Sequence, residues 1–160
     1  MSRKKMWRNV VVAASNFTCV YPLWKSISVG DYVTSGVLSF VAGASIVSHL
    51  AENHKHGMPG IGWSKRTSYI LNRLDVLGCL LTAGRLGYMY YSRYGLTLSP
   101  MMDDKLLLAT SLIAFGFLRI SEFDKSSDPQ LRTLYMVTHS IWHVTIFKLI
   151  GCFLGQVLYG

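Results

Sequence analysis

Apolar residues gather into long runs along this chain, and short polar stretches separate the runs. Clear examples are residues 32–50 and residues 105–118. A helix needs about 20 mostly apolar residues to cross the hydrocarbon core of a membrane. Several runs reach or approach that length. The pattern therefore predicts an all-α, polytopic bundle of about five transmembrane helices, at 9–28, 31–50, 68–91, 104–120 and 131–159.

The third of these segments departs from a simple transmembrane pattern. It carries Arg73, Asp75 and Arg85, and charged side chains are costly in lipid unless they face the interior of a bundle. The five segments together use most of the chain. We therefore expect residues 1–160 to form a single integral membrane domain, with no separate soluble domain.

Composition and charge support a membrane protein more than a nucleic-acid-binding one. Only 15% of the residues are charged, whereas soluble domains carry about 25%. The net charge of +8 would suit nucleic acid, but the basic residues follow a topological pattern. With the N-terminus in the cytoplasm, the cytoplasmic side receives Arg3, Lys4, Lys5, Arg8, Lys55, Lys65, Arg66, Arg119, Lys125 and Arg132. The opposite side receives only Lys25, Arg93 and Lys105. This positive-inside bias predicts a multi-pass protein with a cytoplasmic N-terminus, in a membrane that the sequence does not specify.

A small set of polar residues interrupts the apolar runs in a regular way. The second segment ends with Ser45 and His49, the third begins near Asp75, and the last contains His139 and His143. Residues four apart lie on the same face of a helix. Two imidazoles spaced in this way can bind one metal ion at about 2.0–2.1 Å.

The predicted topology places these residues at matching depths, in the cytoplasmic half of the bilayer. Three neutral histidines with one open position make a catalytic type of zinc site. We therefore predict that His49, His139 and His143 bind Zn²⁺. Asp75 would accept a proton from the zinc-activated water or orient it, and Ser45 would donate a hydrogen bond at the same site.

Other interpretations of the histidines remain open. Intramembrane histidines often serve only as hydrogen-bond partners between helices. Haem fits less well, because His139 and His143 share one face and cannot lie on opposite sides of a haem plane. His54 and His56 do not match the H-E-x-x-H pattern of zinc proteases, and the sequence leaves their role open.

The ordered set of S-x-x-x-H, then Asp, then H-x-x-x-H resembles the CREST superfamily of membrane hydrolases. This superfamily includes alkaline ceramidases, adiponectin and progestin receptors, and hemolysin III-like proteins. The segments "LNRLDVLGCLLTAG" and "HSIWHV" are similar to its aspartate and last-helix motifs. The resemblance implies that the three histidines bind zinc, with the Ser and Asp beside it, and some members hydrolyse the amide bond of ceramide. The superfamily has seven spans, so this chain would be a shortened form.

The sequence therefore predicts an intramembrane zinc-dependent hydrolase that acts on a ceramide-like lipid amide. The alternative is a non-catalytic, receptor-like or structural membrane protein. In that case zinc or interhelical hydrogen bonds only hold the bundle together. The expected partners are the lipid bilayer and a lipid substrate. A homo-oligomer that completes the pocket also stays open, although no feature of the sequence demands one.

Overall fold

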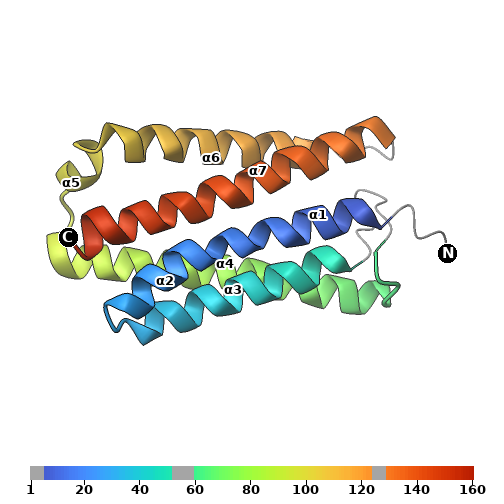
Figure 1. Cartoon of the computed structure of the whole chain (residues 1–160), viewed down its shortest axis with the longest axis horizontal. Helices are drawn as coiled ribbons and strands as arrows, with labels where there is room; N and C mark the ends of the chain where they lie inside the picture. The colour runs from blue at the N-terminus through green and yellow to red at the C-terminus, as the bar shows by residue number, and fades with distance from the viewer. Residues whose placement is uncertain (1–5, 52–59, 124–128) are drawn as a thin grey trace.

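The computed structural model of the chain describes residues 6–51, 60–123 and 129–160, and these are almost wholly helical (Figure 1). The elements are α1 (Trp7–Ser15), the 3₁₀ segment η2 (Asn16–Cys19), α2 (Val20–Ser28), α3 (Tyr32–Leu50), α4 (Lys65–Tyr94), α5 (Ser99–Met102), α6 (Lys105–Phe123), α7 (Pro129–Phe153) and the π-helical turn η3 (Leu154–Leu158). The all-α class agrees with the prediction, and each of the five predicted segments is helical apart from an end residue at Asp31, Asp104 and Tyr159.

Local sequence signals set the ends of several helices. The Asp31 carboxylate accepts a hydrogen bond from the backbone N–H of Thr34 at 3.0 Å and so caps the start of α3. Ser64 caps α4 in the same way, through the N–H of Thr67 at 3.1 Å. These side chains satisfy backbone donors that have no partner within the helix. Between α2 and α3 the chain reverses at Gly30, whose φ of 76° suits glycine.

The long helices lie side by side along the length of the molecule (Figure 1). α3 packs against α4, α6 packs against α7, and α1 with α2 contacts both α3 and α7. The backbones of α3 and α4 approach closely at Gly78, where a Cβ atom would lie only 2.9 Å from the Cα of Val41. A glycine is therefore required for this spacing of the two helices.

Two apolar clusters form the core, and they lie at different heights along α7. The larger includes Leu38, Phe147 and Leu154. The smaller consists of Val12, Tyr135 and Met136. His139 and His143 fall between Met136 and Phe147 in the sequence of α7, so the histidines occupy the region between the two clusters.

A polar network joins α3, α4 and the C-terminal end. We call Asp31, Thr34, Arg85 and Tyr159 the Asp31 network. Arg85 Nη2 donates to both oxygens of the Asp31 carboxylate at 3.0 Å, and Arg85 Nε donates to Thr34 Oγ1 at 3.0 Å. The Tyr159 hydroxyl donates to Asp31 Oδ2 at 3.1 Å. Arg85 therefore makes three hydrogen bonds to α3 and its N-cap residue.

The prediction of about five transmembrane helices is wrong. Among the residues that the structure describes, two helical segments are long and apolar enough to cross a membrane, namely Tyr32–Leu50 and Arg132–Leu158. Only 33% and 39% of the respective windows are buried inside the bundle. The other residues of these two windows are partly or fully exposed on the surface of the described chain.

The other predicted spans fall short for separate physical reasons. The first is divided into two nine-residue α-helices by η2. The 30-residue α4 is long enough, but it carries Arg73, Asp75 and Arg85 in its interior. In α6 the uncharged stretch between Lys105 and Arg119 is residues 106–118, thirteen residues, which is short of the roughly 20 that a span requires.

Candidate metal centre

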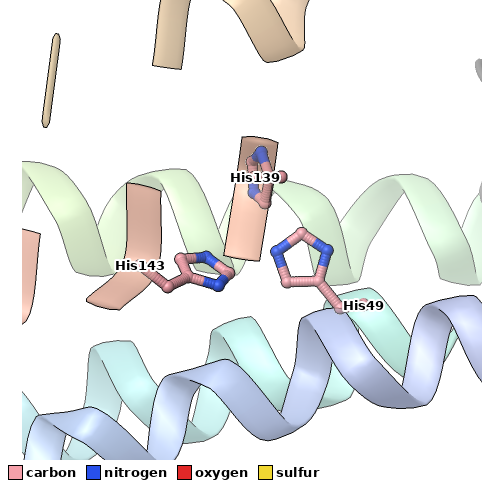
Figure 2. A group of neighbouring side chains, drawn as sticks. All are labelled: His49, His139 and His143. Carbon is pink, nitrogen blue, oxygen red and sulfur yellow. The ribbon is translucent and has the colours of Figure 1, made fainter. Parts of the chain in front are cut away.

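Three histidines from two helices meet in the interior of the bundle (Figure 2). His49 comes from the last turn of α3, and His139 and His143 come from neighbouring turns of α7. The ring centroids form a nearly regular triangle, with separations of 4.8 Å, 5.0 Å and 4.7 Å. His143 is only 2% exposed, and the His49 side chain is 11% exposed. The predicted ligands are therefore brought together, largely shielded from solvent.

The donor set fits a metal ion. One nitrogen from each ring lies within 4.8 Å of the other two. Nitrogens that share a tetrahedral zinc ion at 2.1 Å lie about 3.4 Å apart, so small side-chain rotations would bring the rings to that spacing. His49 Nε2 is buried and makes no hydrogen bond. A buried polar atom without a partner is costly, and coordination to a metal would remove that cost.

Two serines and an asparagine surround the outer edges of the imidazoles. Ser15 Oγ, at the end of α1, lies 2.7 Å from His143 Nδ1. Asn16 Nδ2 lies 3.3 Å from the same nitrogen. Ser121 Oγ, from α6, lies 3.2 Å from His139 Nδ1. The sequence prediction missed all three residues. Their only signal is a small polar side chain within an apolar run, and this signal becomes specific only when the neighbouring helices are known.

Aromatic rings complete the surroundings of the two histidines of α7. Tyr135 stacks on His139 with centroids 4.9 Å apart and an interplanar angle of 24°. Trp142 lies 5.1 Å from the His139 ring and 4.9 Å from the His143 ring. These apolar faces limit the rotation of the imidazoles and exclude water from their flanks. The environment therefore favours neutral rings over charged ones.

Asp75 and Ser45 form a pair beside the histidines, on facing turns of α4 and α3. Asp75 Oδ2 lies 3.9 Å from His49 Nε2, beyond hydrogen-bond distance but close enough for a water molecule or metal ion to link the two groups. The Ser45 side chain is hydrogen-bonded to the Asp75 carboxylate and is 3% exposed. The hydroxyl of Ser45 is thus directed at Asp75.

An apolar cavity of about 490 Å³ adjoins this group. Its wall includes Ser45, Asp75 and His143, together with apolar side chains of α3, α4, α6 and α7 such as Val41, Leu86 and Phe153. Small-molecule sites typically occupy about 300–1,000 Å³ and are mostly apolar with a few polar groups. The cavity is therefore of a size and character suited to an apolar ligand whose polar group reaches Asp75 and His143.

His54 and His56 lie outside the described residues, so the structure does not place them relative to the cluster. Within the part of the chain that is described, His49, His139 and His143 are the group of side chains that could hold a metal ion.

Fold and site together define an all-α helical bundle with a three-histidine cluster compatible with a metal ion. The chain is 50% identical over 151 residues to "Uncharacterized protein L282" of Acanthamoeba polyphaga mimivirus, and this similarity covers 94% of the chain and 99% of the viral protein. The chain therefore belongs to the same protein family as this mimivirus protein. No family model matches the chain, and no solved structure matches it.

Proposed function

We propose that this protein is a membrane-embedded, zinc-dependent hydrolase that acts on the amide bond of a ceramide-like lipid. One observation carries the proposal: an apolar cavity has Ser45, Asp75 and His143 in its wall, and His143 belongs to the three-histidine cluster that could hold a metal ion. The resemblance of the same residues to the CREST superfamily supports it.

The chemistry divides between the metal and the side chains of the chain itself. Zn²⁺ held by His49, His139 and His143 would supply Lewis acidity and lower the pKa of a bound water to about 7. Among the described residues, Asp75 is the carboxylate in the wall of the cavity, and it would accept the proton that the attacking water loses. Ser45 donates its hydrogen bond to Asp75 and so orients this base. The structure thus favours a positioning role for Ser45 over direct contact with the water.

The surface and the cavity both favour a lipid substrate. Large apolar side chains are exposed on several helices, including Leu80 on α4 and Leu112 on α6, at 65% and 67% respectively. Extended exposed apolar surface marks contact with a membrane or another apolar partner. α3 and α7 are long and apolar enough to cross a bilayer. An acyl chain in the apolar part of the cavity would leave its amide next to the polar wall.

The test uses purified full-length protein in detergent micelles with a fluorescent ceramide. Wild type should contain about one zinc per chain and release fatty acid. Asp75→Asn should retain zinc but lose turnover by about 10²–10⁴-fold, because it removes a general base. Asp103→Asn, a carboxylate that bonds to Ser99 outside the site, should change neither. Zinc-free, folded wild type, or full turnover in Asp75→Asn, would contradict the proposal.

A non-catalytic role for the metal is the second candidate, and one observation favours it. The ligands come from α3 and α7, and these two helices pack mainly against α4 and α6 respectively, and little against each other. A metal ion would therefore link two helices that share little other contact. In this case chelation should lower the melting temperature, while no ceramide turnover should be detected at any zinc content.

A further inference from the structure

The two serines at the histidine cluster have the same unusual pattern of contacts. Each hydroxyl lies close to a backbone carbonyl of its own helix and, at the same time, to the Nδ1 atom of a cluster histidine. For Ser15 the distances are 2.6 Å to the Val12 carbonyl oxygen and 2.7 Å to His143 Nδ1. A serine hydroxyl has only one proton to donate. Counting protons therefore shows which histidine nitrogen carries hydrogen.

The Val12 carbonyl can only accept a hydrogen bond, so the Ser15 proton is directed at it. The lone pairs of Ser15 Oγ then face His143 Nδ1, and Nδ1 must be the donor. If Nδ1 were unprotonated, Ser15 would have to turn its proton toward the ring. Two oxygen atoms would then face each other at 2.6 Å with no hydrogen between them. Only the Nδ1–H tautomer of His143 satisfies both contacts.

Ser121 repeats the arrangement on the other side of the cluster. Its Oγ lies 2.7 Å from the Leu118 carbonyl oxygen, to which it donates, and 3.2 Å from His139 Nδ1. The same proton count makes His139 Nδ1 a donor to Ser121. Serines on α1 and α6, far apart in the sequence, thus impose one tautomer on two histidines of α7.

The contact between Asn16 and His143 would favour the opposite tautomer. Its Nδ2 lies 3.3 Å from His143 Nδ1, and a bond from this donor would need an unprotonated Nδ1. The Ser15 contact is 0.6 Å shorter (3.3 − 2.7) and therefore dominates. Asn16 Oδ1 is buried without a partner. Asn16 Nδ2 also donates to the carbonyl oxygens of Val12 and Ala13, each at 3.4 Å, so its hydrogens have acceptors other than His143 Nδ1.

We propose that Ser15 and Ser121 are positioning residues that hold His143 and His139 in the Nδ1–H tautomer, so that Nε2 of each ring carries the lone pair for the metal. This inference rests on the proposed zinc site and adds the residues that prepare it before metal arrives. Metal-binding histidines commonly donate their second ring nitrogen to such a partner, and loss of the partner typically weakens metal binding about 10–100-fold.

The first experiment reads the tautomers directly in metal-free protein. Long-range ¹H–¹⁵N correlation spectra of ¹⁵N-histidine-labelled wild type distinguish Nδ1–H from Nε2–H in neutral imidazoles. His139 and His143 should both show the Nδ1–H pattern. A wild-type spectrum with Nε2–H at His143 overturns the proposal. This measurement needs neither zinc nor substrate, so it separates a failure of the serine assignment from a failure of the proposed hydrolase.

The second experiment measures zinc affinity by competition with a chromophoric chelator. Ser15→Ala and Ser121→Ala should each weaken zinc binding about 10–100-fold and give mixed tautomers in the spectra. Ser15→Thr keeps the hydroxyl and should restore both properties. Ser26→Ala is the matched control, because the Ser26 hydroxyl also donates to a backbone carbonyl and contacts a second side chain, Ser35.

The outcomes are distinct. Unchanged tautomers and unchanged affinity in folded Ser15→Ala overturn the proposal, as does an equal loss of affinity in Ser26→Ala, which would indicate a general effect on folding. If Ser15→Ala does not fold, the wild-type spectrum and the Ser121→Ala variant still decide. If wild type shows Nδ1–H at both histidines but binds no zinc, the serine assignment stands and the zinc hydrolase fails.

Discussion

Two polar groups lie inside this apolar bundle, and they differ in how fully their atoms are paired. In the Asp31 network, Arg85 makes three hydrogen bonds, two of them to the Asp31 carboxylate, which also accepts from Thr34 and Tyr159. In the histidine cluster, His49 Nε2 is buried with no hydrogen bond, and the Asp75 carboxylate stops 3.9 Å short of it.

The comparison teaches how to tell a structural polar group from a functional one. In a fully paired network, the hydrogen bonds offset the loss of hydration of the polar groups, so no further ligand is required. A buried polar atom without a partner has a cost that the fold alone does not repay, and such atoms call for an explanation such as a bound ion. The Asp31 network holds helices together, whereas the histidine cluster is compatible with a bound metal ion.

The largest expected effect on stability comes from removing Arg85 from the Asp31 network. Arg85→Ala removes the ion pair and hydrogen bonds of the Asp31 carboxylate, whose side chain is 14% exposed, and we expect a loss of about 2 kcal/mol in the free energy of unfolding. Zinc content per folded chain should not change. Thermal unfolding in detergent measures the first quantity and elemental analysis the second. Arg73→Ala, an exposed arginine on the same helix, is the control, and an equal loss there would remove the distinction.

An intermediate effect should appear in acid. Burial alone would raise the pKa of the Asp31 carboxyl, but hydrogen bonds from Thr34 and Arg85 lower it below its usual value. The folded state therefore holds the charged carboxylate more strongly than the unfolded chain does. The resulting stability is fully present above the unfolded pKa of about 3.9 and is lost as the pH falls through the lower folded pKa. The difference in melting temperature between wild type and Asp31→Asn should shrink over that interval; a constant difference would argue against it.

The smallest effect should follow from removing the unsatisfied atom. In metal-free protein, His49→Phe replaces a ring that lacks a partner at Nε2 by an apolar ring of similar shape. Such replacements are close to neutral or stabilising, so we expect a change within about 1 kcal/mol in the free energy of unfolding. Zinc binding should be abolished. A loss of 2–3 kcal/mol without metal, the size expected for a broken hydrogen-bond network, would show that His49 is structural.

The sequence predicted the helices better than their relation to a membrane. Apolar runs placed all five segments in helices because such runs depend only on neighbouring residues. The transmembrane prediction failed for α4 because the interior charges of that helix were treated as exceptions. Arg85 illustrates the difficulty, because its partner Asp31 lies 54 positions away in the sequence. The sequence alone does not show whether such a charge is paired with another helix or is unpaired.

The histidines of the cluster were predictable from the sequence, whereas the residues around them were not. Histidines four residues apart on one helix, with a third at a matching position, were sufficient to predict that His49, His139 and His143 would lie together. Ser15 and Ser121 were not predictable, because serines are common on apolar helices and their meaning depends on which helix faces which. Periodicity along one helix is sufficient to predict the histidines, whereas the serines can be identified only from the packing of the helices.

Gly78 gives the close contact between α3 and α4 a meaning beyond packing. Val41 is one turn before Ser45 on α3, and Gly78 is one turn after Asp75 on α4. The close contact between the two helices is therefore one helical turn from the Ser45–Asp75 pair. It fixes the distance between α3 and α4 at that height. A misplacement of about 1 Å in a reacting group can cost about 10²-fold in rate. Gly78, which has no side chain, thus helps to fix the position of Asp75, the proposed base.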